Sequence, residues 1–269
     1  MNHADRSFPL PDTQALTDPR GLPVTRAGVS GLSLPARVVD VDQRACDTVA
    51  RFDLAVGVPA AQRGTHMSRL VEAAHELAQG LELGHLDGAV QRLMQRMEAD
   101  TGHIHCAFPW FVRKTAPASG RTSLLDLEVE AWAQLDAPGR MPVRQLRVHL
   151  PVTTLCPCSK AISRYGAHNQ RSRVSVTLRA ERMPSVAQLA AWVDEQASCG
   201  VYAVLKREDE KAVTEAAYEN PKFAEDLVRD LYLSLQRNID TQYLRVATEN
   251  HESIHNHAAY AVVDQVHVQ

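Results

Sequence analysis

Apolar and polar residues alternate along several stretches of the chain, and this alternation predicts β-strands with one buried and one open face. The clearest example begins at Phe52, where Leu54 and Val56 follow with Asp53 and Ala55 between them. Related patterns predict further strands at 36–41, 103–113, 125–133, 143–155, 173–179, 243–247 and 259–263.

Other stretches carry an apolar residue at every third or fourth position, which is the period of an amphipathic helix. Two such helices are predicted, one on each side of Gly84. In the second half of the chain, Ser185 and Gln188 have the spacing of a capping box ahead of a third helix. A fourth helix follows Asn220 and Pro221. Its apolar row is Phe223, Leu227, Leu231 and Leu235.

The order strand, strand, helix, helix, strand, strand therefore occurs twice, although the two halves show no sequence identity. We expect two similar modules, at about 35–136 and 142–269, within one catalytic unit (35–269). Each module would be an antiparallel sheet with helices on one face, an α+β arrangement. Residues 1–34 are rich in proline, glycine and polar residues, and we expect them to form an extended or partly disordered arm.

The composition excludes several classes of protein. The chain has 269 residues, of which 45% are hydrophobic and 23% charged, as in a globular enzyme. The net charge of −3, without a basic stripe, argues against nucleic acid as the partner. No apolar run approaches the roughly 20 residues that cross a membrane, and the N-terminus lacks a signal-peptide core. Five cysteines fit reduced thiols better than a disulfide framework, so we expect a cytoplasmic protein.

The stretch 151–173 concentrates reactive side chains between two predicted strands. Cys156 follows one strand and His168 precedes the next, so the loop between them could direct both toward one metal ion. Thiolate and neutral imidazole are common ligands of zinc-like ions. Cys156 and Cys158 are too close in sequence for an ordinary disulfide. The alternative is a buried thiol beside a hydrogen-bonded loop histidine.

The motif Leu-Cys-Pro-Cys-Ser-Lys, followed by Tyr-Gly-Ala-His-Asn-Gln-Arg, resembles the prokaryotic type IB GTP cyclohydrolases. Three more segments agree with that family, in the family's order: 63–69, the acidic run around Glu210, and 250–255. The resemblance implies the tunnelling fold, in which each chain has two modules and sheets from several modules close a barrel around a tunnel. It also implies a homotetramer with sites near the junctions between subunits.

The resemblance places the family's metal ligands on Cys156, His168 and Glu210. Taken alone, the charged run around Glu210 indicates a solvated helix face, and Glu208 or Asp209 would be the ligand if the register differs. Three protein ligands leave one position open for water. The better-known type I enzymes hold zinc with two cysteines and a histidine. A glutamate in place of one thiolate widens the choice of the single divalent ion to zinc, manganese or iron.

The turn between the last two predicted strands contains Glu252 and His255, which the resemblance makes catalytic, with Cys158 nearby. Histidine is the natural proton shuttle near neutral pH. Taken alone, the histidines of this turn would be surface residues or a weak adventitious metal cluster, and Cys158 a packing residue.

The resemblance also assigns substrate-binding residues. Glu225, on the fourth helix, matches the glutamate with which tunnelling-fold enzymes hold the N–H groups of a purine or pterin. From composition alone, Glu225 would be an exposed partner of Arg229. Three candidates for the triphosphate surround the start of the first helix, where a merely solvated helix start is equally expected. The triphosphate candidates are Arg63, His66, Arg69, Lys160 and Arg171.

The activity that the resemblance implies is conversion of GTP and water to 7,8-dihydroneopterin triphosphate and formate, the first step of de novo tetrahydrofolate biosynthesis. A metal-bound water can attack C8 of guanine, and the ring nitrogens then need a positioned acid. One alternative is another tunnelling-fold enzyme, such as a deazapurine nitrile reductase or a pterin aldolase, which would not need the metal ligands. The other is a non-catalytic, metal-stabilised interaction protein that binds no nucleotide.

Overall fold

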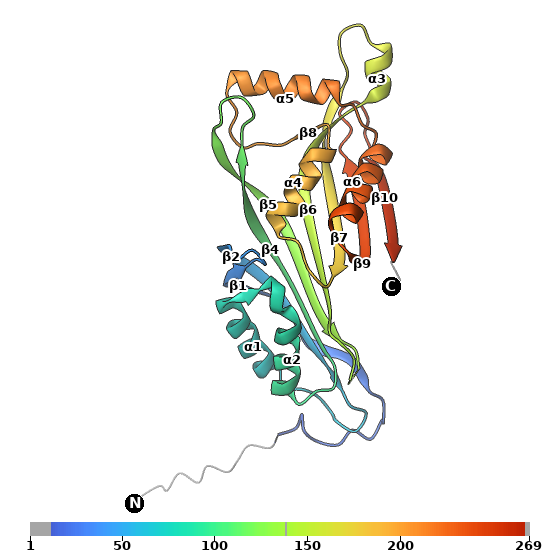
Figure 1. Ribbon diagram of the computed structural model, residues 1–269. Helices are drawn as coiled ribbons and strands as arrows, with labels where there is room; N and C mark the ends of the chain where they lie inside the picture. Colours follow the sequence, from blue (N-terminus) through green and yellow to red (C-terminus); the bar gives the residue numbers. More distant parts are fainter. Residues whose placement is uncertain (1–11, 138, 267–269) are drawn as a thin grey trace, which may run out of the picture.

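The computed structural model describes residues 12–137 and 139–266. A single sheet runs through the whole molecule, with its strands in the order β10-β9-β7-β6-β5-β4-β2-β1-β3 and β8 beside β6 (Figure 1). All pairings are antiparallel except that of β3 with β1. The strands are β1 (Val24–Val39), β2 (Ala45–Val58), β3 (Leu81–Glu82), β4 (Gly102–Thr115), β5 (Thr122–Leu135), β6 (Val143–Leu155), β7 (Asn169–Ala180), β8 (Cys199–Gly200), β9 (Thr241–Asn250) and β10 (Ala259–Val266).

Helices cover one face of this sheet. Two helices pack side by side on the first module and two on the second, while α5 crosses the end of the second module near α3 (Figure 1). The helices are α1 (Met67–Gln79), α2 (Leu86–Met97), α3 (Pro157–Ile162), α4 (Val186–Gln196), α5 (Arg207–Glu219) and α6 (Ala224–Asn238). None of the helices within the described residues is long and apolar enough to cross a membrane.

The predicted order of elements is confirmed in both modules, and β5 of the first pairs with β6 of the second to make one continuous sheet. The helix break near Gly84 is a 3₁₀ turn (Leu83–His85), and the capping box of Ser185 and Gln188 starts α4. The α+β arrangement with helices on one face is therefore the one that the sequence predicts. The second module adds α3, α5 and β8 to the repeated pattern.

The boundary of the predicted N-terminal arm (1–34) is wrong in its second part, because β1 already begins at Val24. Most side chains at the start of β1 are exposed, and its pairing with β2 shifts register twice before Leu32, so no apolar period marks it. Main-chain hydrogen bonds to β2 hold this segment instead. The first eleven residues of the predicted arm lie outside the described residues.

Cross-strand pairing explains why the sheet has two contrasting faces. One row of directly paired residues crosses six strands and is almost completely buried under the helices: Phe52, Cys106, Ala131, Leu146, Leu178 and Leu244. Because successive side chains in a strand point to opposite faces, the residues next to this row all lie on the open face. Apart from Ala107, these neighbours are polar or aromatic, and they include Asp53, His105, Trp132, Glu130 and Arg147.

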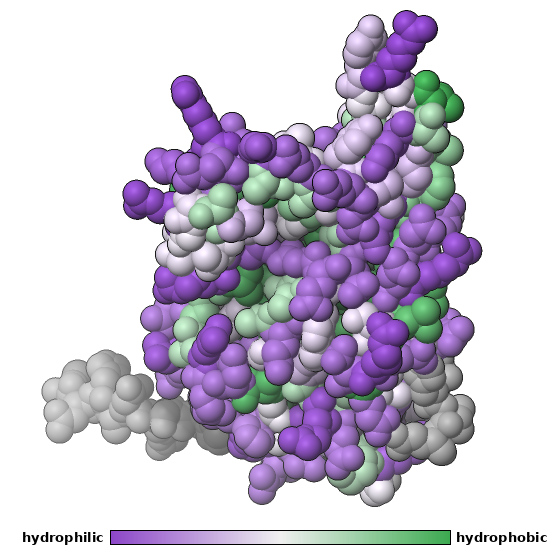
Figure 2. Space-filling model, turned by 45° about the horizontal axis from the view of Figure 1, so that its top comes forward, coloured by the Kyte–Doolittle hydropathy of each residue, from purple (hydrophilic) through white to green (hydrophobic). Residues whose placement is uncertain are grey.

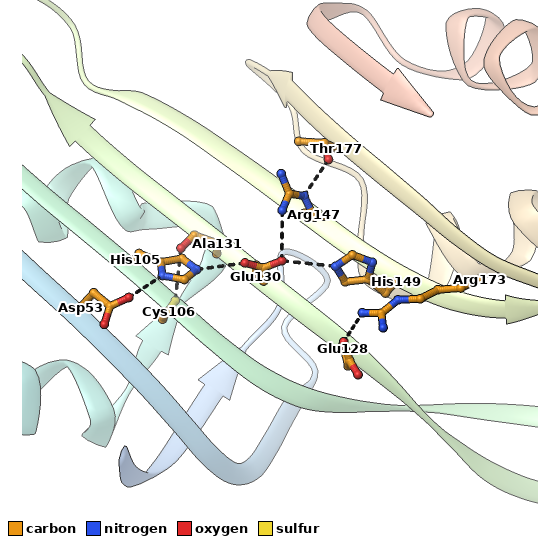
Figure 3. A network of polar contacts seen from close by, with 10 residues as sticks. All are labelled: Asp53, His105, Cys106, Glu128, Glu130, Ala131, Arg147, His149, Arg173 and Thr177. Carbon is orange, nitrogen blue, oxygen red and sulfur yellow. Dashed lines mark hydrogen bonds and ion pairs between the residues drawn. The ribbon is translucent and has the colours of Figure 1, made fainter. Parts of the chain in front are cut away.

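The polar groups of the open face bind one another across the strands (Figure 3). His105 lies between two carboxylates, with Nδ1 2.9 Å from Asp53 and Nε2 3.2 Å from Glu130. The second oxygen of Glu130 accepts from Arg147 at 3.3 Å and from His149 at 3.2 Å. The network therefore ties β2, β4, β5 and β6 together on the face opposite the described helices.

The network also fixes the charge of Glu130. Burial alone would raise the pKa of this carboxyl group, but the hydrogen bond from His149, the charge of Arg147 and the hydrogen bond from His105 together hold the pKa below its ordinary value of 4.5. A carboxylate whose pKa is lower in the folded than in the unfolded chain stabilises the fold above its unfolded pKa. This stabilisation is lost as the pH falls through the lowered folded pKa.

We expect Glu130→Gln to lower the free energy of unfolding at pH 7 by about 1–2 kcal/mol, because charge-assisted hydrogen bonds from two histidines and an arginine are weakened. The deficit relative to wild type should shrink below pH 4.5, where Glu130 of the unfolded chain takes up a proton, and should vanish as the pH falls through the lowered pKa of the folded state. Denaturant unfolding at pH 7 and at pH 3.5 measures both differences. Glu72→Gln, at an exposed ion pair with Arg96, is the control and should change little. A pH-independent deficit for Glu130→Gln would contradict the prediction.

Candidate active site

The loop between β6 and β7 brings Cys156 and His168 together. The Cys156 N–H donates to the His168 carbonyl oxygen at 3.0 Å, which continues the β6–β7 pairing by one step beyond Leu155 and Asn169. Cys156 also begins α3: its sulfur accepts from the Ser159 N–H at 3.4 Å, and proline follows at the first helical position. The backbone thus places a half-buried thiol and a histidine side by side at the end of the sheet.

A chain of hydrogen bonds orients the His168 ring. Its Nδ1 lies 3.1 Å from Oε1 of Gln170, whose Nε2 donates to the Thr154 hydroxyl at 2.8 Å. The Thr154 hydroxyl in turn lies 2.8 Å from the Ser172 hydroxyl. Gln170, Thr154 and Ser172 are all buried. An amide oxygen can only accept, so Nδ1 carries a proton, and in a neutral imidazole Nε2 then has the lone pair. This is the tautomer in which histidine binds a metal through Nε2.

Glu252 lies beside this pair. One of its carboxylate oxygens is 3.8 Å from His168 Nδ1, and its side chain is only 11% exposed. The turn after β9 is held there because the His251 N–H donates to the Arg171 carbonyl oxygen at 3.0 Å. His255 belongs to the same turn; it is exposed and its ring stacks on His257 with centroids 5.1 Å apart. The structure therefore brings Cys156, His168 and Glu252 to one end of the sheet, next to the turn that carries His255.

The acidic run at the start of α5 divides into residues with different surroundings. Asp209 is completely buried and accepts from the Ala118, Ser119 and Lys206 N–H groups at 2.8–2.9 Å and from the Ser119 hydroxyl at 2.6 Å. Burial would raise the pKa of Asp209, but the bonds from Ser119 and the backbone hold it well below its usual range. Asp209 therefore fastens α5 to the turn between β4 and β5 and has no oxygen to spare for a metal.

Glu210 is the next residue along α5 and is exposed. No group of three or more His, Cys, Asp or Glu side chains within residues 12–137 and 139–266 is arranged to hold a metal ion. The single chain thus pairs Cys156 with His168 without joining Glu210 to them, and the three-ligand set stays a prediction.

The residues predicted to bind the substrate fall into two groups. Near the Cys156 loop, Glu225 is exposed on the first turn of α6, and the segment before it is held by the Lys222 N–H, which donates to the Leu155 carbonyl oxygen at 3.0 Å. Among the described ion pairs there is none between Glu225 and Arg229, so the alternative role of Glu225 as its partner is not seen. Cys158 is exposed on α3.

Lys160 is already engaged: its ammonium group donates to the Tyr218 carbonyl oxygen and lies 4.4 Å from the centroid of the Tyr218 ring. The group around the start of α1 lies on the first module, away from α3 (Figure 1). There the His66 Nε2 is 3.3 Å from Asp12, and the Arg63 N–H donates to Leu16. One chain therefore does not bring Arg63, His66 and Arg69 to the Cys156 loop.

Sequence patterns did not identify Gln170 or Asp209 in these roles. Two local signals were available. Gln170 follows His168 by two residues and lies on the buried side of a strand, and Asp209 is the third residue of a helix. Both sequence features are common in proteins that have no active site at that place. The roles of Gln170 and Asp209 therefore become clear only from their hydrogen-bond partners in the folded chain.

Residues 10–261 match the family described as type I GTP cyclohydrolase FolE2. The chain is 43% identical over 265 residues to GTP cyclohydrolase FolE2 of Ralstonia nicotianae, covering 98% of each chain. It is 44% identical to GTP cyclohydrolase FolE2 of Bordetella pertussis over 261 residues, covering 97% of this chain and 98% of the other. Among solved structures, urate oxidase of Bacillus sp. TB-90 aligns with 90% of this chain and 98% of its own at 8% identity, with a TM-score of 0.46.

Proposed function

The chain belongs to the FolE2 family of type I GTP cyclohydrolases, and we propose that it converts GTP and water to 7,8-dihydroneopterin triphosphate and formate, the entry to tetrahydrofolate synthesis. The observation that supports this most is the end of the sheet, where Cys156 and the lone pair of His168 Nε2 lie beside the acid and histidine of the next turn. This arrangement combines a place for a metal with groups that can carry protons.

We propose zinc, manganese or iron as the one divalent ion of each site, with Cys156, His168 and Glu210 as its ligands. The donor set fits such an ion, because thiolate, imidazole and carboxylate together accept a borderline metal. The tautomer that Gln170 imposes on His168 is the one that such binding requires. When bound, the ion would supply an acidified water for attack on C8 of guanine.

The proton transfers are proposed for Glu252 and His255, with Cys158 nearby. Glu252 is mostly buried against His168, whereas His255 is exposed on a turn and free to reach a substrate. Glu225 would accept from the guanine N1–H and 2-amino groups, because α6 begins next to the residue that precedes Cys156. This carboxylate would hold the base with the five-membered ring of the purine toward Cys156 and His168.

We also propose a homotetramer in which several sheets close into a barrel. At the two ends of the described sheet, β10 and most of β1 have no strand on their outer side, since β3 pairs with β1 over only two residues, and closure with other copies would satisfy the main-chain groups there. The loop from 156 to 168 projects from the end of the sheet (Figure 1) and exposes Ile162 and Tyr165 by 86% and 94%. On the face drawn in Figure 2, hydrophobic residues otherwise form small groups among polar ones. Large side chains at the tip of a loop suit a contact with a neighbouring subunit.

The proposed location is the cytoplasm, and the proposed partners are GTP and other copies of the chain, without nucleic acid or membrane. All five cysteines are free thiols, which fits a reducing compartment.

Cys156→Ala should abolish stoichiometric metal and turnover while the fold survives, because the thiolate is the softest of the three proposed ligands. Metal analysis, together with assays for formate and for a fluorescent pterin after oxidation, measures both losses. Cys46→Ala, at a half-buried thiol on β2, is the control and should keep metal and activity. Full metal retention by Cys156→Ala would exclude this ligand set, and absence of formate from metal-loaded wild type would exclude the activity.

Glu225→Gln should weaken GTP binding by about tenfold or more with metal content unchanged, because an amide cannot accept from both guanine donors. Equilibrium binding of GTP at fixed metal loading is the measurement. Arg229→Ala, which alters the same exposed face of α6, should leave GTP affinity as it is. Equal affinity of wild type and Glu225→Gln would remove this residue from base recognition.

The assembly should be seen by light scattering as four copies of the chain at assay concentration. A mixture of Cys156→Ala and Glu225→Gln subunits, dissociated, reassembled together and assayed at a GTP concentration at which neither variant alone turns over, should regain activity if each site takes these residues from two chains. A fully active monomer would refute the barrel, and a mixture that stays inactive would confine both residues to one chain.

A further inference from the structure

Ser159 lies in the first turn of α3 and contacts both Cys156 and His168. Its N–H donates to the Cys156 sulfur at 3.4 Å, and its hydroxyl donates to the Cys156 carbonyl oxygen at 3.2 Å. The same hydroxyl oxygen accepts from the His168 N–H at 3.2 Å. A hydroxyl has one proton to donate and two lone pairs, so it makes both contacts at once. One serine side chain thus joins the two residues at the end of β6 and the start of β7.

The contact with His168 differs in kind from the two contacts with Cys156. A serine in a helix commonly bonds to a carbonyl oxygen three or four residues earlier, and the residue at the N-cap commonly accepts from the third helical N–H. Formation of α3 therefore accounts for both contacts with Cys156. The contact with His168 spans nine residues and lies outside the helix. It serves the loop rather than α3.

This contact closes a ring of hydrogen bonds at the neck of the loop. The Cys156 N–H donates to the His168 carbonyl oxygen at 3.0 Å, while the His168 N–H donates to the Ser159 hydroxyl. Both main-chain polar groups of His168 are therefore bound to residues 156–159. Beyond the neck, residues 161–165 are exposed to solvent. Motion of this tip consequently need not displace the backbone of Cys156 or of His168.

Ser159 and Gln170 constrain different parts of His168. Gln170 orients the ring through Nδ1, whereas Ser159 holds the main-chain nitrogen and hence the position from which the side chain starts. On the other side of the neck, the Ser159 N–H directs the Cys156 sulfur. Together these bonds place the thiol and the imidazole before any ion is bound.

We propose that Ser159 is a positioning residue of the metal site, whose hydroxyl sets the spacing between Cys156 and His168. This inference rests on the proposed ligand set and adds a residue that touches neither the ion nor the substrate. Hydrogen bonds that orient metal ligands typically change metal affinity by about 10–100-fold. Without the hydroxyl, binding of the ion must also order the neck of the loop, and the lost conformational entropy weakens binding.

Zinc titration of the metal-free full-length chain against a chelating indicator tests this role. Ser159→Ala removes only the hydroxyl contacts and should raise the Kd for Zn²⁺ by about tenfold or more. At saturating zinc, kcat and KM for GTP should stay within about threefold of wild type, because the role is exerted through the ion. Ser159→Thr, which keeps a hydroxyl, should restore most of the affinity.

Ser163→Ala is the matched control. Ser163 belongs to the same loop, and its hydroxyl accepts from the Tyr165 N–H at 3.3 Å within the exposed tip. This variant should keep the zinc affinity of wild type. With cobalt in place of zinc, Ser159→Ala at saturation should still show the sulfur-to-cobalt charge-transfer absorption, since Cys156 remains available as a ligand.

Hydrogen exchange of the metal-free protein gives a readout that is independent of the ion. In Ser159→Ala the His168 N–H should exchange about tenfold faster than in wild type, because one hydrogen bond of about 1 kcal/mol is lost. The Cys156 N–H keeps its own acceptor and should change less. If the His168 N–H of wild type exchanges as fast as in an unfolded peptide, the inference is overturned without any variant.

The remaining outcomes separate this inference from the proposed function. Equal zinc affinity of wild type and Ser159→Ala, an equal loss in Ser163→Ala, or no recovery in Ser159→Thr would overturn the role of Ser159 while the activity stands. Full metal retention by Cys156→Ala would exclude the ligand set and this inference with it. If metal-loaded wild type forms no formate from GTP, the activity fails separately, and the zinc titration still decides on Ser159.

Discussion

The structure depends on the one-sided burial of a long antiparallel sheet. A row of apolar residues from Phe52 to Leu244 crosses six strands, and four helices remove it from water. Burial of that face is the main stabilising contribution, since apolar surface contributes about 25 cal/mol for each Å² removed from water. The same pleat turns every second side chain to the other face, which none of the described helices covers. Sequence choices on that face are therefore governed by hydrogen bonding and charge.

The open face meets this requirement with paired polar groups. Glu130 accepts from two histidines and an arginine, and Arg147 also donates to the Thr177 hydroxyl at 3.0 Å. Trp132 stacks on His105 with centroids 4.7 Å apart, so aromatic surface is covered by the network as well. His149 belongs to this network and also lines a groove of about 240 Å³ together with Arg171 and Arg173.

The end of the sheet uses the same pairing for chemistry. The main-chain hydrogen bond between Cys156 and His168 is one more step of the β6–β7 ladder. The backbone positions of both residues are therefore fixed by two long paired strands. Gln170 and Thr154 lie on the buried side of those strands. Gln170 orients the imidazole through the hydrogen bond to Nδ1, and Thr154 in turn holds Gln170. Asp209 gives α5 a comparable anchor on the turn between β4 and β5, next to the exposed Glu210. Function at this site thus depends on loops, but their positions come from strand register.

The sequence by itself determined the long strands and the four helices on the sheet, together with their order, because the alternation at Phe52 and the helical row at Leu227 follow from which residues each segment buries. It did not predict the short additions α3 and β8. It also determined the family, because the Cys156 to Arg171 motif is long and specific. Only the tertiary structure decided that β1 starts at Val24, that Asp209 is an anchor, that Gln170 orients His168, and that Arg171 shares a groove with Arg173 and Glu128. These facts depend on pairing between segments distant in the chain, and a local period carries no information about which partner a polar group will meet.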